Sequence, residues 1–133
     1  MIGKNDISNL RPNATMVGSA IIEKWGDAAR LGFMAVPDIL LKSQSKLALT
    51  SPEMVVLMNV LMHWWYADKR PFPRSTTISK RMGITARSVQ RILRRIEQMK
   101  LIRRVEEPDG NTSIDPSPLV EKLSDYARSD PEY

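Results

Sequence analysis

The stretch from Ser75 to Arg104 constrains the fold most, because it carries the signals of two helices joined by a tight turn. Ile78 and Met82 lie four residues apart, which places them on one face of a short helix. Gly83 follows at once, and glycine ends helices readily because it adopts left-handed backbone angles without steric cost. Thr85 offers a side-chain oxygen that can cap a second helix. Together these signals predict a helix-turn-helix.

The second helix of this motif has an apolar face and a basic face. Apolar residues recur at the spacing of a single buried face, and they are Val89, Ile92, Leu93, Ile96 and Met99. At about 100° per residue, the opposite side carries Arg87, Arg91, Arg94 and Gln98, with Gln90 and Arg95 on its flanks. A face of this kind can meet phosphates and base edges.

Positive charge is concentrated on this part of the chain. Between Arg70 and Arg104 there are eleven Lys and Arg residues and one acid, Glu97, which gives a net charge of +10. The whole chain carries only +5, so the remaining residues sum to −5. Such an asymmetry is typical of a nucleic-acid-binding protein.

Composition narrows the class of protein. The 133 residues suit one domain with a modest core, and 42% hydrophobic with 26% charged residues is typical of a soluble globular chain. No apolar run reaches the roughly 18 residues of a membrane span, and Met1 to Leu10 lacks the pattern of a secretory signal. We therefore expect a cytoplasmic protein, associated with the nucleoid of a bacterium and with no membrane partner.

Catalysis and metal binding find little support in the sequence. The absence of cysteine excludes disulfides, zinc ribbons and thiol catalysis, and His63 is the only histidine. Asp27, Asp38 and Asp68 show no metal-ligand spacing, and the chain has no glycine-rich phosphate loop. We expect a protein that is not an enzyme and has no catalytic residue, metal, cofactor or small-molecule effector.

The N-terminal third has weaker signals. We expect a flexible arm over residues 1–15 and a helix from about Val17 to Leu31, which Gly32 stops. Phe33 to Val36 can form a short strand, and Asp38 to Lys42 a helical turn. Ser43 to Lys46 is interpreted as a polar connection.

A strong helix start follows at Thr50. Thr50 can cap, Pro52 tolerates the first turn, and Glu53 stands where a capping box requires it. The helix is expected to run to about Ala67 and is apolar almost all round, so it should be covered on more than one side. Trp64 and Trp65 are adjacent and point about 100° apart, so at least one should lie outside the central core, against Trp25 or a dimer partner.

A hairpin and a last helix complete the predicted fold. Leu101 to Glu106 has the composition of a strand, residues 107–111 that of a turn, and Thr112 to Asp115 that of the partner strand. Ser117 then opens an amphipathic helix. The expected fold is mainly α with a small β-hairpin wing, a winged helix-turn-helix with an added N-terminal helix and a C-terminal helix. Its expected parts are an arm at 1–15, a helix and connection at 16–48, a DNA-binding domain at 49–116, and a helix and tail at 117–133.

The stretch from Leu49 to Pro116, half of the chain, resembles a known family. Its marks are LTSPEMVVLMNVL, FPRSTTISKRMGITARSVQRILRRIEQMKLIRR and the Asp109-Gly110 turn. It is similar to the winged helix-turn-helix family of small bacterial DNA-binding proteins, a domain also found at the N-termini of plasmid and phage replication proteins. The resemblance implies that the helix from Thr85 to Lys100 enters the major groove of double-stranded DNA with its N-terminal half.

Only the first turns of a docked helix reach base edges, which selects the expected contacts. Base contacts are expected from Arg87, Ser88, Gln90 and Arg91. Phosphate contacts are expected from Arg74, Ser75, Thr76, Thr85, Arg94 and Arg95. The hairpin tip departs from the family pattern because it holds Glu106, Glu107 and Asp109, which phosphate repels. Arg103 and Arg104 at the hairpin base are the expected contributors instead, and the wing itself can be structural.

Three functions remain open. The first is a sequence-specific transcriptional regulator that binds its operator as a homodimer, through the amphipathic stretches at 17–31 and 117–128. The second is a replication or partition accessory protein of a plasmid, phage or integrated element. The third is a winged-helix module that binds proteins, with the arginines as an ordinary solvated helix face.

Overall fold

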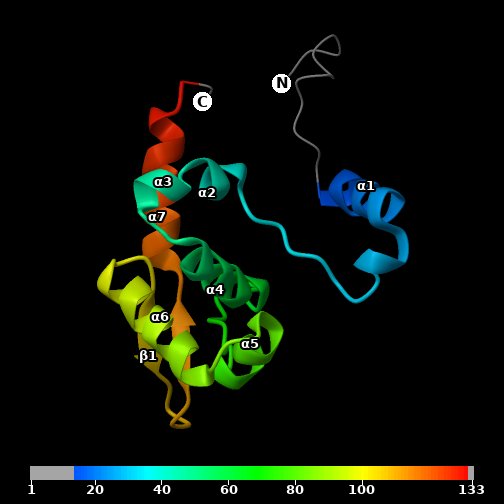
Figure 1. Cartoon of the computed structure of the whole chain (residues 1–133). Helices are drawn as coiled ribbons and strands as arrows, with labels where there is room; N and C mark the ends of the chain where they lie inside the picture. The colour runs from blue at the N-terminus through cyan, green and yellow to red at the C-terminus, as the bar shows by residue number, and fades with distance from the viewer. Residues whose placement is uncertain (1–13, 132–133) are drawn as a thin grey trace. The chain divides into compact units, whose positions relative to one another are not determined.

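The computed structural model describes residues 14–131, which belong to two compact units, residues 1–33 and 34–133 (Figure 1). The described part of the first unit holds helix α1 (Ala14–Trp25) and a 3-10 turn η2 (Gly26–Ala29). The single helix expected over 17–31 is therefore interrupted, because Gly26 takes a left-handed φ of +57° and ends the α-helix. Residues 1–13 of the expected arm lie outside the described residues.

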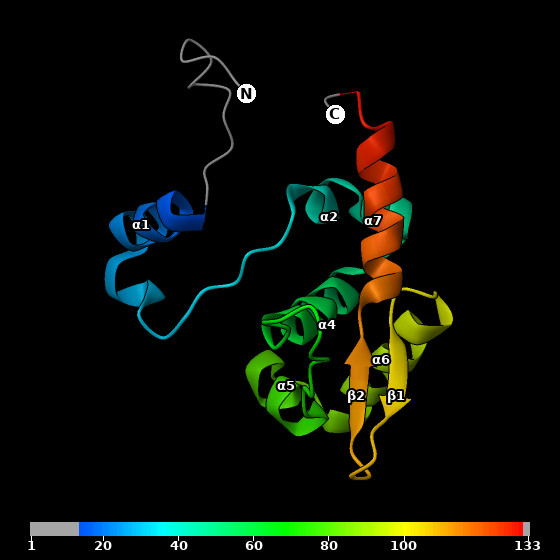
Figure 2. The same ribbon diagram turned by 180° about the vertical axis from the view of Figure 1, so that it is seen from behind.

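The second unit contains six helices and one hairpin in its described part. They are α2 (Asp38–Lys42), α3 (Gln44–Leu47), α4 (Ser51–Met62), α5 (Ser75–Met82), α6 (Ala86–Gln98), β1 (Arg103–Glu106), β2 (Thr112–Asp115) and α7 (Ser117–Ser129). The strands pair antiparallel, with Arg103 opposite Asp115 and Glu106 opposite Thr112. Seen from behind, the hairpin lies across α6 (Figure 2). The predicted fold class, mainly helical with a two-stranded wing and added helices, is confirmed.

Three local predictions between residues 33 and 67 were wrong. Residues 33–36 form no strand, because no partner strand is available to them within the described part of the chain. The connection at 43–46 is instead the short helix α3, which is stabilised by burial of Leu47. Helix α4 ends at Met62, five residues before Ala67. Across residues 14–131, none of the helices has both the length and the hydropathy that crossing a bilayer requires.

The capping box predicted for α4 is present. The backbone N–H of Thr50 donates to Glu53 Oε1 over 2.9 Å, and the N–H of Glu53 donates to Thr50 Oγ1 over 3.3 Å. Two N–H groups at the helix start are thereby satisfied by side chains. The capping box therefore fixes the start of α4. It also fixes the position of Glu53, which contacts Arg95 of α6.

The core is built where α6 crosses α4. Val89, Leu93 and Ile96 of α6 are buried, as the periodicity predicted, and they share one apolar cluster with residues of α4. The α4 members that are completely inaccessible are Val56, Leu57 and Val60. Burying each of these side chains is worth about 1.5–3 kcal/mol. This packing fixes which face of α6 is turned to solvent.

The turn between α5 and α6 depends on Gly83. Its φ is +70°, and its N–H donates to the carbonyl of Ser79 over 2.9 Å as α5 ends. A Cβ at this position would meet no atom within 4 Å, so the demand for glycine comes from the backbone angle alone.

We expect Gly83→Ala to lower the free energy of unfolding by about 1–2 kcal/mol, the cost of an L-residue in the left-handed region. Gly83→Asn should cost less, because asparagine tolerates these angles better. Urea denaturation of the three proteins gives the order Gly, Asn, Ala. Equal stability of the alanine variant would contradict this account of the turn.

Candidate nucleic-acid interface

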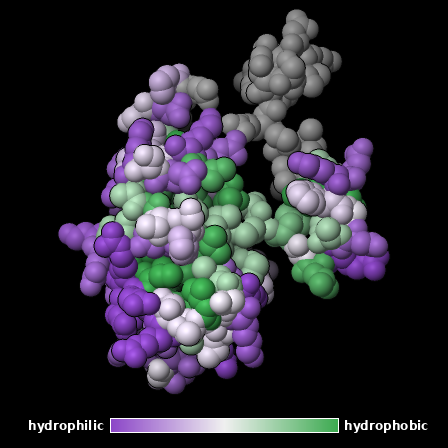
Figure 3. All heavy atoms as spheres, viewed as in Figure 1, coloured by the Kyte–Doolittle hydropathy of each residue, from purple (hydrophilic) through white to green (hydrophobic). Residues whose placement is uncertain are grey.

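The outer face of α6 is a basic surface on a rigidly packed helix. Arg87, Gln90, Arg91 and Arg94 are exposed, while the opposite face of the helix is buried. Hydrophilic side chains gather along the lower left of the larger unit, where Figure 1 places α6 (Figure 3). The structure thus confirms the two-faced helix that the spacing predicted.

The first turn of α6 is organised by a chain of hydroxyl contacts. Thr85 caps the helix as predicted, since its Oγ1 accepts from the backbone N–H of Ser88 over 3.1 Å. The same hydroxyl donates to Ser88 Oγ over 2.9 Å, and Arg91 Nη2 donates to that Ser88 oxygen over 3.2 Å. Three of the predicted DNA-contacting residues are therefore linked, and Arg91 is partly pre-oriented along the helix face.

Arg95 has a structural partner that sequence reasoning missed. Its Nε donates to Glu53 Oε2 over 2.8 Å, although the two residues are 42 positions apart. The Glu53 side chain is only 6% exposed, whereas that of Arg95 is 60% exposed. Burial raises the pKa of Glu53, but hydrogen bonds from Thr50 and Arg95 outweigh this and lower the pKa below its ordinary value. Arg95 therefore holds α6 to the start of α4.

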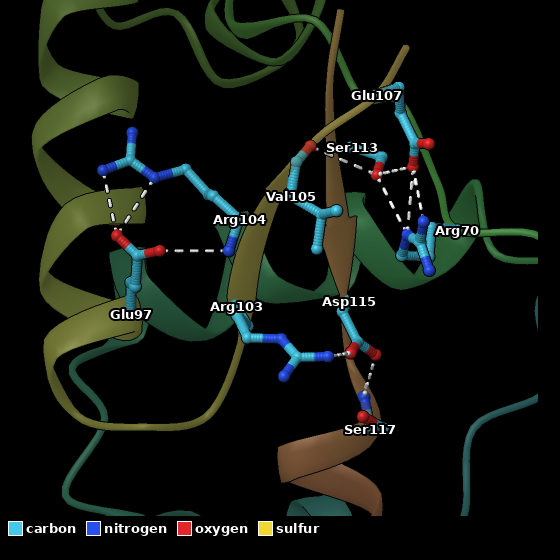
Figure 4. Close-up of polar contacts among 9 residues, drawn as sticks. All are labelled: Arg70, Glu97, Arg103, Arg104, Val105, Glu107, Ser113, Asp115 and Ser117. Atoms are coloured by element: carbon cyan, nitrogen blue, oxygen red, sulfur yellow. Dashed lines mark hydrogen bonds and ion pairs between the residues drawn. The ribbon is translucent and has the colours of Figure 1, made fainter.

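The two arginines at the hairpin base are also engaged in ion pairs (Figure 4). Arg103 Nη2 lies 2.6 Å from Asp115 Oδ2 across the hairpin, and Arg104 Nη2 lies 2.9 Å from Glu97 Oε1 of α6. The backbone N–H of Arg104 also donates to Glu97, and the hydrogen bonds from Arg104 lower the pKa of that carboxyl. These contacts fasten β1 to both β2 and α6.

The acidic hairpin tip is held by Arg70, whose role the sequence did not reveal. Glu107 Oε1 accepts from Ser113 Oγ over 2.6 Å and from Arg70 Nη2 over 2.8 Å, as Figure 4 shows. The hydrogen bond from Ser113, followed by that from Arg70, lowers the pKa of Glu107. Beside this contact, the N–H of Ile114 donates to the carbonyl of Pro71 over 3.0 Å. The hairpin is therefore anchored to the chain that precedes α5.

A set of cations around α6 remains available for a ligand. Arg74, Arg87 and Arg94 form no ion pair with any residue in the described range 14–131. Arg74 stands at the N-terminus of α5, where no side chain caps the helix, next to Ser75 and Thr76. Unsatisfied N–H groups at such a terminus attract anions. Among the arginines predicted to contact phosphate, Arg74 and Arg94 are therefore free of ion pairs. The other three are paired with carboxylates, and they are Arg95, Arg103 and Arg104.

A second surface feature was not foreseen from the sequence. An apolar groove with a volume of about 270 Å³ lies between α2, the end of α4 and α7. Its walls include Val36, Ile39, Leu61, Trp64, Val120 and Leu123. Residues from three separate stretches of the chain meet there, which explains why no local pattern predicted it. Within residues 14–131 there is no cluster of His, Cys, Asp and Glu that could hold a metal ion.

Adjacent arginines of α6 are expected to behave differently on substitution. Arg95→Ala leaves the buried Glu53 carboxylate unpaired and should lower the free energy of unfolding by about 1–2 kcal/mol, between the values of exposed and buried pairs. Arg94→Ala, the matched control, removes an exposed cation without an ion-pair partner in the described structure and should leave stability unchanged. Urea unfolding at neutral pH measures both.

The pH dependence of the Arg95→Ala effect follows from Glu53. Its folded pKa lies below the ordinary value of 4.5, so its contribution is present above that value and is lost as the pH falls through the folded pKa. The stability difference between wild type and Arg95→Ala should therefore shrink in acid. A difference that is independent of pH would mean that Arg95 does not act through Glu53.

Comparisons with known proteins agree with this fold. The model of the DnaD N-terminal domain matches residues 36–132. The chain is also similar to a crystal structure of the N-terminal domain of DnaD protein from Geobacillus kaustophilus, with a TM-score of 0.60 and 26% sequence identity. That similarity covers 80% of this chain and 90% of the solved chain. No curated protein matches.

The family match covers most of the chain and includes every element that builds the basic surface. It begins just before α2 and extends through the helix-turn-helix and the hairpin to α7. This chain belongs to the DnaD N-terminal domain family.

Proposed function

We propose that this protein binds double-stranded DNA through α6 as part of DNA replication. The observation that carries the proposal is the exposed arginine face of α6, held outward by a buried apolar face and by Arg95–Glu53. Membership of the DnaD N-terminal domain family supports the replication role, the second of the three functions that the sequence left open. A role in transcriptional regulation receives no comparable support.

In this proposal α6 lies in the major groove and its first two turns meet base edges. Arg87, Ser88, Gln90 and Arg91 read bases, and Arg94 contacts phosphate from the next turn. Arg74, with Ser75 and Thr76, holds the backbone at the N-terminus of α5, and Thr85 does so at the start of α6.

The role proposed for three arginines differs from the phosphate contacts that the sequence predicted, and these are Arg95, Arg103 and Arg104. Each would have to leave a carboxylate, on Glu53, Asp115 or Glu97, before it reached a phosphate. We therefore assign these three arginines chiefly to holding α6 and the hairpin together. The acidic tip of the hairpin, with exposed Glu106 and Asp109, points to a structural wing.

Self-association is the second part of the proposal. A single winged helix reads only a few base pairs, so a second copy increases both affinity and specificity. The two regions that support an interface are α1, with exposed Ile22 and Trp25, and the groove beside α7, with exposed Val120. The proposal is a homodimer through one or both of these regions.

Two arginine variants separate base reading from phosphate binding. Arg91→Ala should weaken binding to a preferred duplex by about 1–3 kcal/mol and relax discrimination at one base pair. Arg94→Ala should weaken binding to every duplex alike. If about five phosphates are contacted, log affinity falls against log salt with a slope of roughly −4 to −5, and Arg94→Ala reduces that slope by about one. Fluorescence anisotropy over a salt series measures all of these quantities.

Two outcomes of that titration would contradict the DNA proposal. Absent or salt-independent binding would favour a winged-helix module that binds proteins. Equal weakening of all duplexes by Arg91→Ala would reassign Arg91 to phosphate. If selection of bound fragments from random DNA yields a palindrome, a transcriptional regulator that binds an operator becomes the better explanation. A binding site at a replication origin would support the role proposed here.

The interface is tested by charge introduced on an exposed apolar position. Val120→Glu places a carboxylate at the groove beside α7 and should shift the mass measured by light scattering from dimer to monomer if α7 forms the interface. Trp25→Glu should do so if α1 forms it. A wild-type protein that remains monomeric at working concentrations, with and without DNA, would remove the dimer from the proposal.

A further inference from the structure

The segment between α4 and α5, residues 63–74, presents aromatic rings to solvent, and we call it the aromatic loop. Trp65, Tyr66 and Phe72 are 78%, 63% and 49% exposed. They are the only exposed Phe, Tyr or Trp side chains within residues 34–131. The other two such side chains in that range, Trp64 and Tyr126, are half-buried. A cluster of solvent-exposed aromatic side chains on one surface segment usually marks a binding site.

The loop is fixed to the folded body at both ends. Its first residues continue the end of α4, where the N–H groups of His63 and Trp64 donate to the carbonyls of Val60 and Leu61. Its later part is pinned to the hairpin, because Pro71 is buried and accepts from Ile114, and Arg70 bridges Ser113 and Glu107. The rings are therefore presented on a supported platform, so that binding costs little ordering of the chain.

The charges of the loop favour an anionic ligand. Lys69 and Arg74 lie among the rings, and Asp68 is the only acid within the loop. Arg70 is paired with Glu107 of the hairpin, so Lys69 and the free Arg74 are the cations that the loop offers to a ligand. Lys69 Nζ lies 5.7 Å from the centre of the Tyr66 ring, so a cation and an aromatic face are offered together. A ligand that satisfies both features carries flat π-systems and regular negative charge.

Single-stranded nucleic acid has this chemistry, and a bilayer surface suits the loop less well. Unpaired bases stack on aromatic side chains while the backbone follows nearby cations. Binding in the plane of a bilayer surface typically uses an amphipathic helix, whereas residues 63–74 form no helix and contain no Leu, Ile, Val or Met. A DNA duplex cannot supply the partner either, because its bases are already stacked on one another.

We infer that the aromatic loop is a binding site for single-stranded DNA, distinct from the duplex-binding face of α6, with bases stacked on Trp65 and Phe72. The two surfaces share only Arg74, which lies where the loop ends and α5 begins. The rings of the loop are not needed for duplex binding. A protein that carries both can hold a duplex and an adjoining unpaired strand.

The experiment measures binding of a labelled oligothymidylate, about 20 nucleotides long, and of a mixed-sequence duplex to the full chain. The cations of α6 attract any polyanion, so binding of oligothymidylate by the wild type does not by itself locate the site. The comparison of variants with the wild type provides the test. Trp65→Ala and Phe72→Ala should each weaken oligothymidylate binding by about 5- to 150-fold, the range for loss of one stacked base, and leave duplex affinity unchanged. Trp65→Phe keeps a ring and should retain most of the affinity.

A matched control is Phe33→Ala, which removes a phenyl ring of similar exposure, 54%, outside the loop. It should leave oligothymidylate binding unchanged. The inference is overturned if Phe33→Ala weakens binding as much as Phe72→Ala, or if Trp65→Ala has no effect. It is also overturned if an oligomer of abasic residues binds as tightly as oligothymidylate, because charge alone would then explain the affinity.

Two further outcomes would assign the rings to other partners and overturn the inference. If Trp65→Ala converts a dimer to a monomer without changing oligothymidylate affinity, the loop is a subunit interface. If anionic phospholipid vesicles bind the wild type in preference to oligothymidylate, and Trp65→Ala abolishes that binding, the loop is a membrane contact. Circular dichroism and urea unfolding establish that each variant is folded before it is compared.

Discussion

The contact between α4 and α6 is the constraint on which the rest depends. Buried aliphatic side chains of the two helices lock the rotation of α6, and the Arg95–Glu53 ion pair adds a directional contact at the edge of that packing. Because side chains on a helix are spaced about 100° apart, a fixed apolar face determines where the arginines point. The basic surface therefore exists as a consequence of core packing, and no contact among the arginines themselves is needed to form it.

The basic residues between Arg70 and Arg104 serve two purposes, because some form ion pairs within the protein and others remain available to a ligand. Arg70, Arg95, Arg103 and Arg104 hold four carboxylates and thereby connect the aromatic loop, α4, α6 and the hairpin. These pairs are partly exposed, so each contributes modestly, but together they fix the hairpin against the helix-turn-helix. The arginines of α6 that face solvent keep their charge for a ligand. A count of charge along the sequence therefore overestimates the number of cations available to DNA.

Local signals in the sequence predicted local structure well. Thr50 and Glu53 predicted a capping box, Gly83 and Thr85 the helix-turn-helix, and the Asp109-Gly110 turn the hairpin, because each depends on residues a few positions apart. Features that depend on distant partners were missed. Arg95 was assigned to phosphate because its angle on the helix is readable from spacing, whereas its pairing with Glu53 is a product of tertiary packing. For the same reason α3, the hold of Arg70 on Glu107 and the apolar groove could not be predicted.

The central claim, that α6 meets duplex DNA with its N-terminal half, is tested most directly by backbone amide chemical-shift mapping during titration with a duplex. We predict the largest changes at residues 85–94 and around the N-terminus of α5 at 74–77, with small changes in α2 and α7. Changes confined to α7, α1 or the hairpin tip, with the amides of 85–94 unmoved at saturating duplex, would contradict the account.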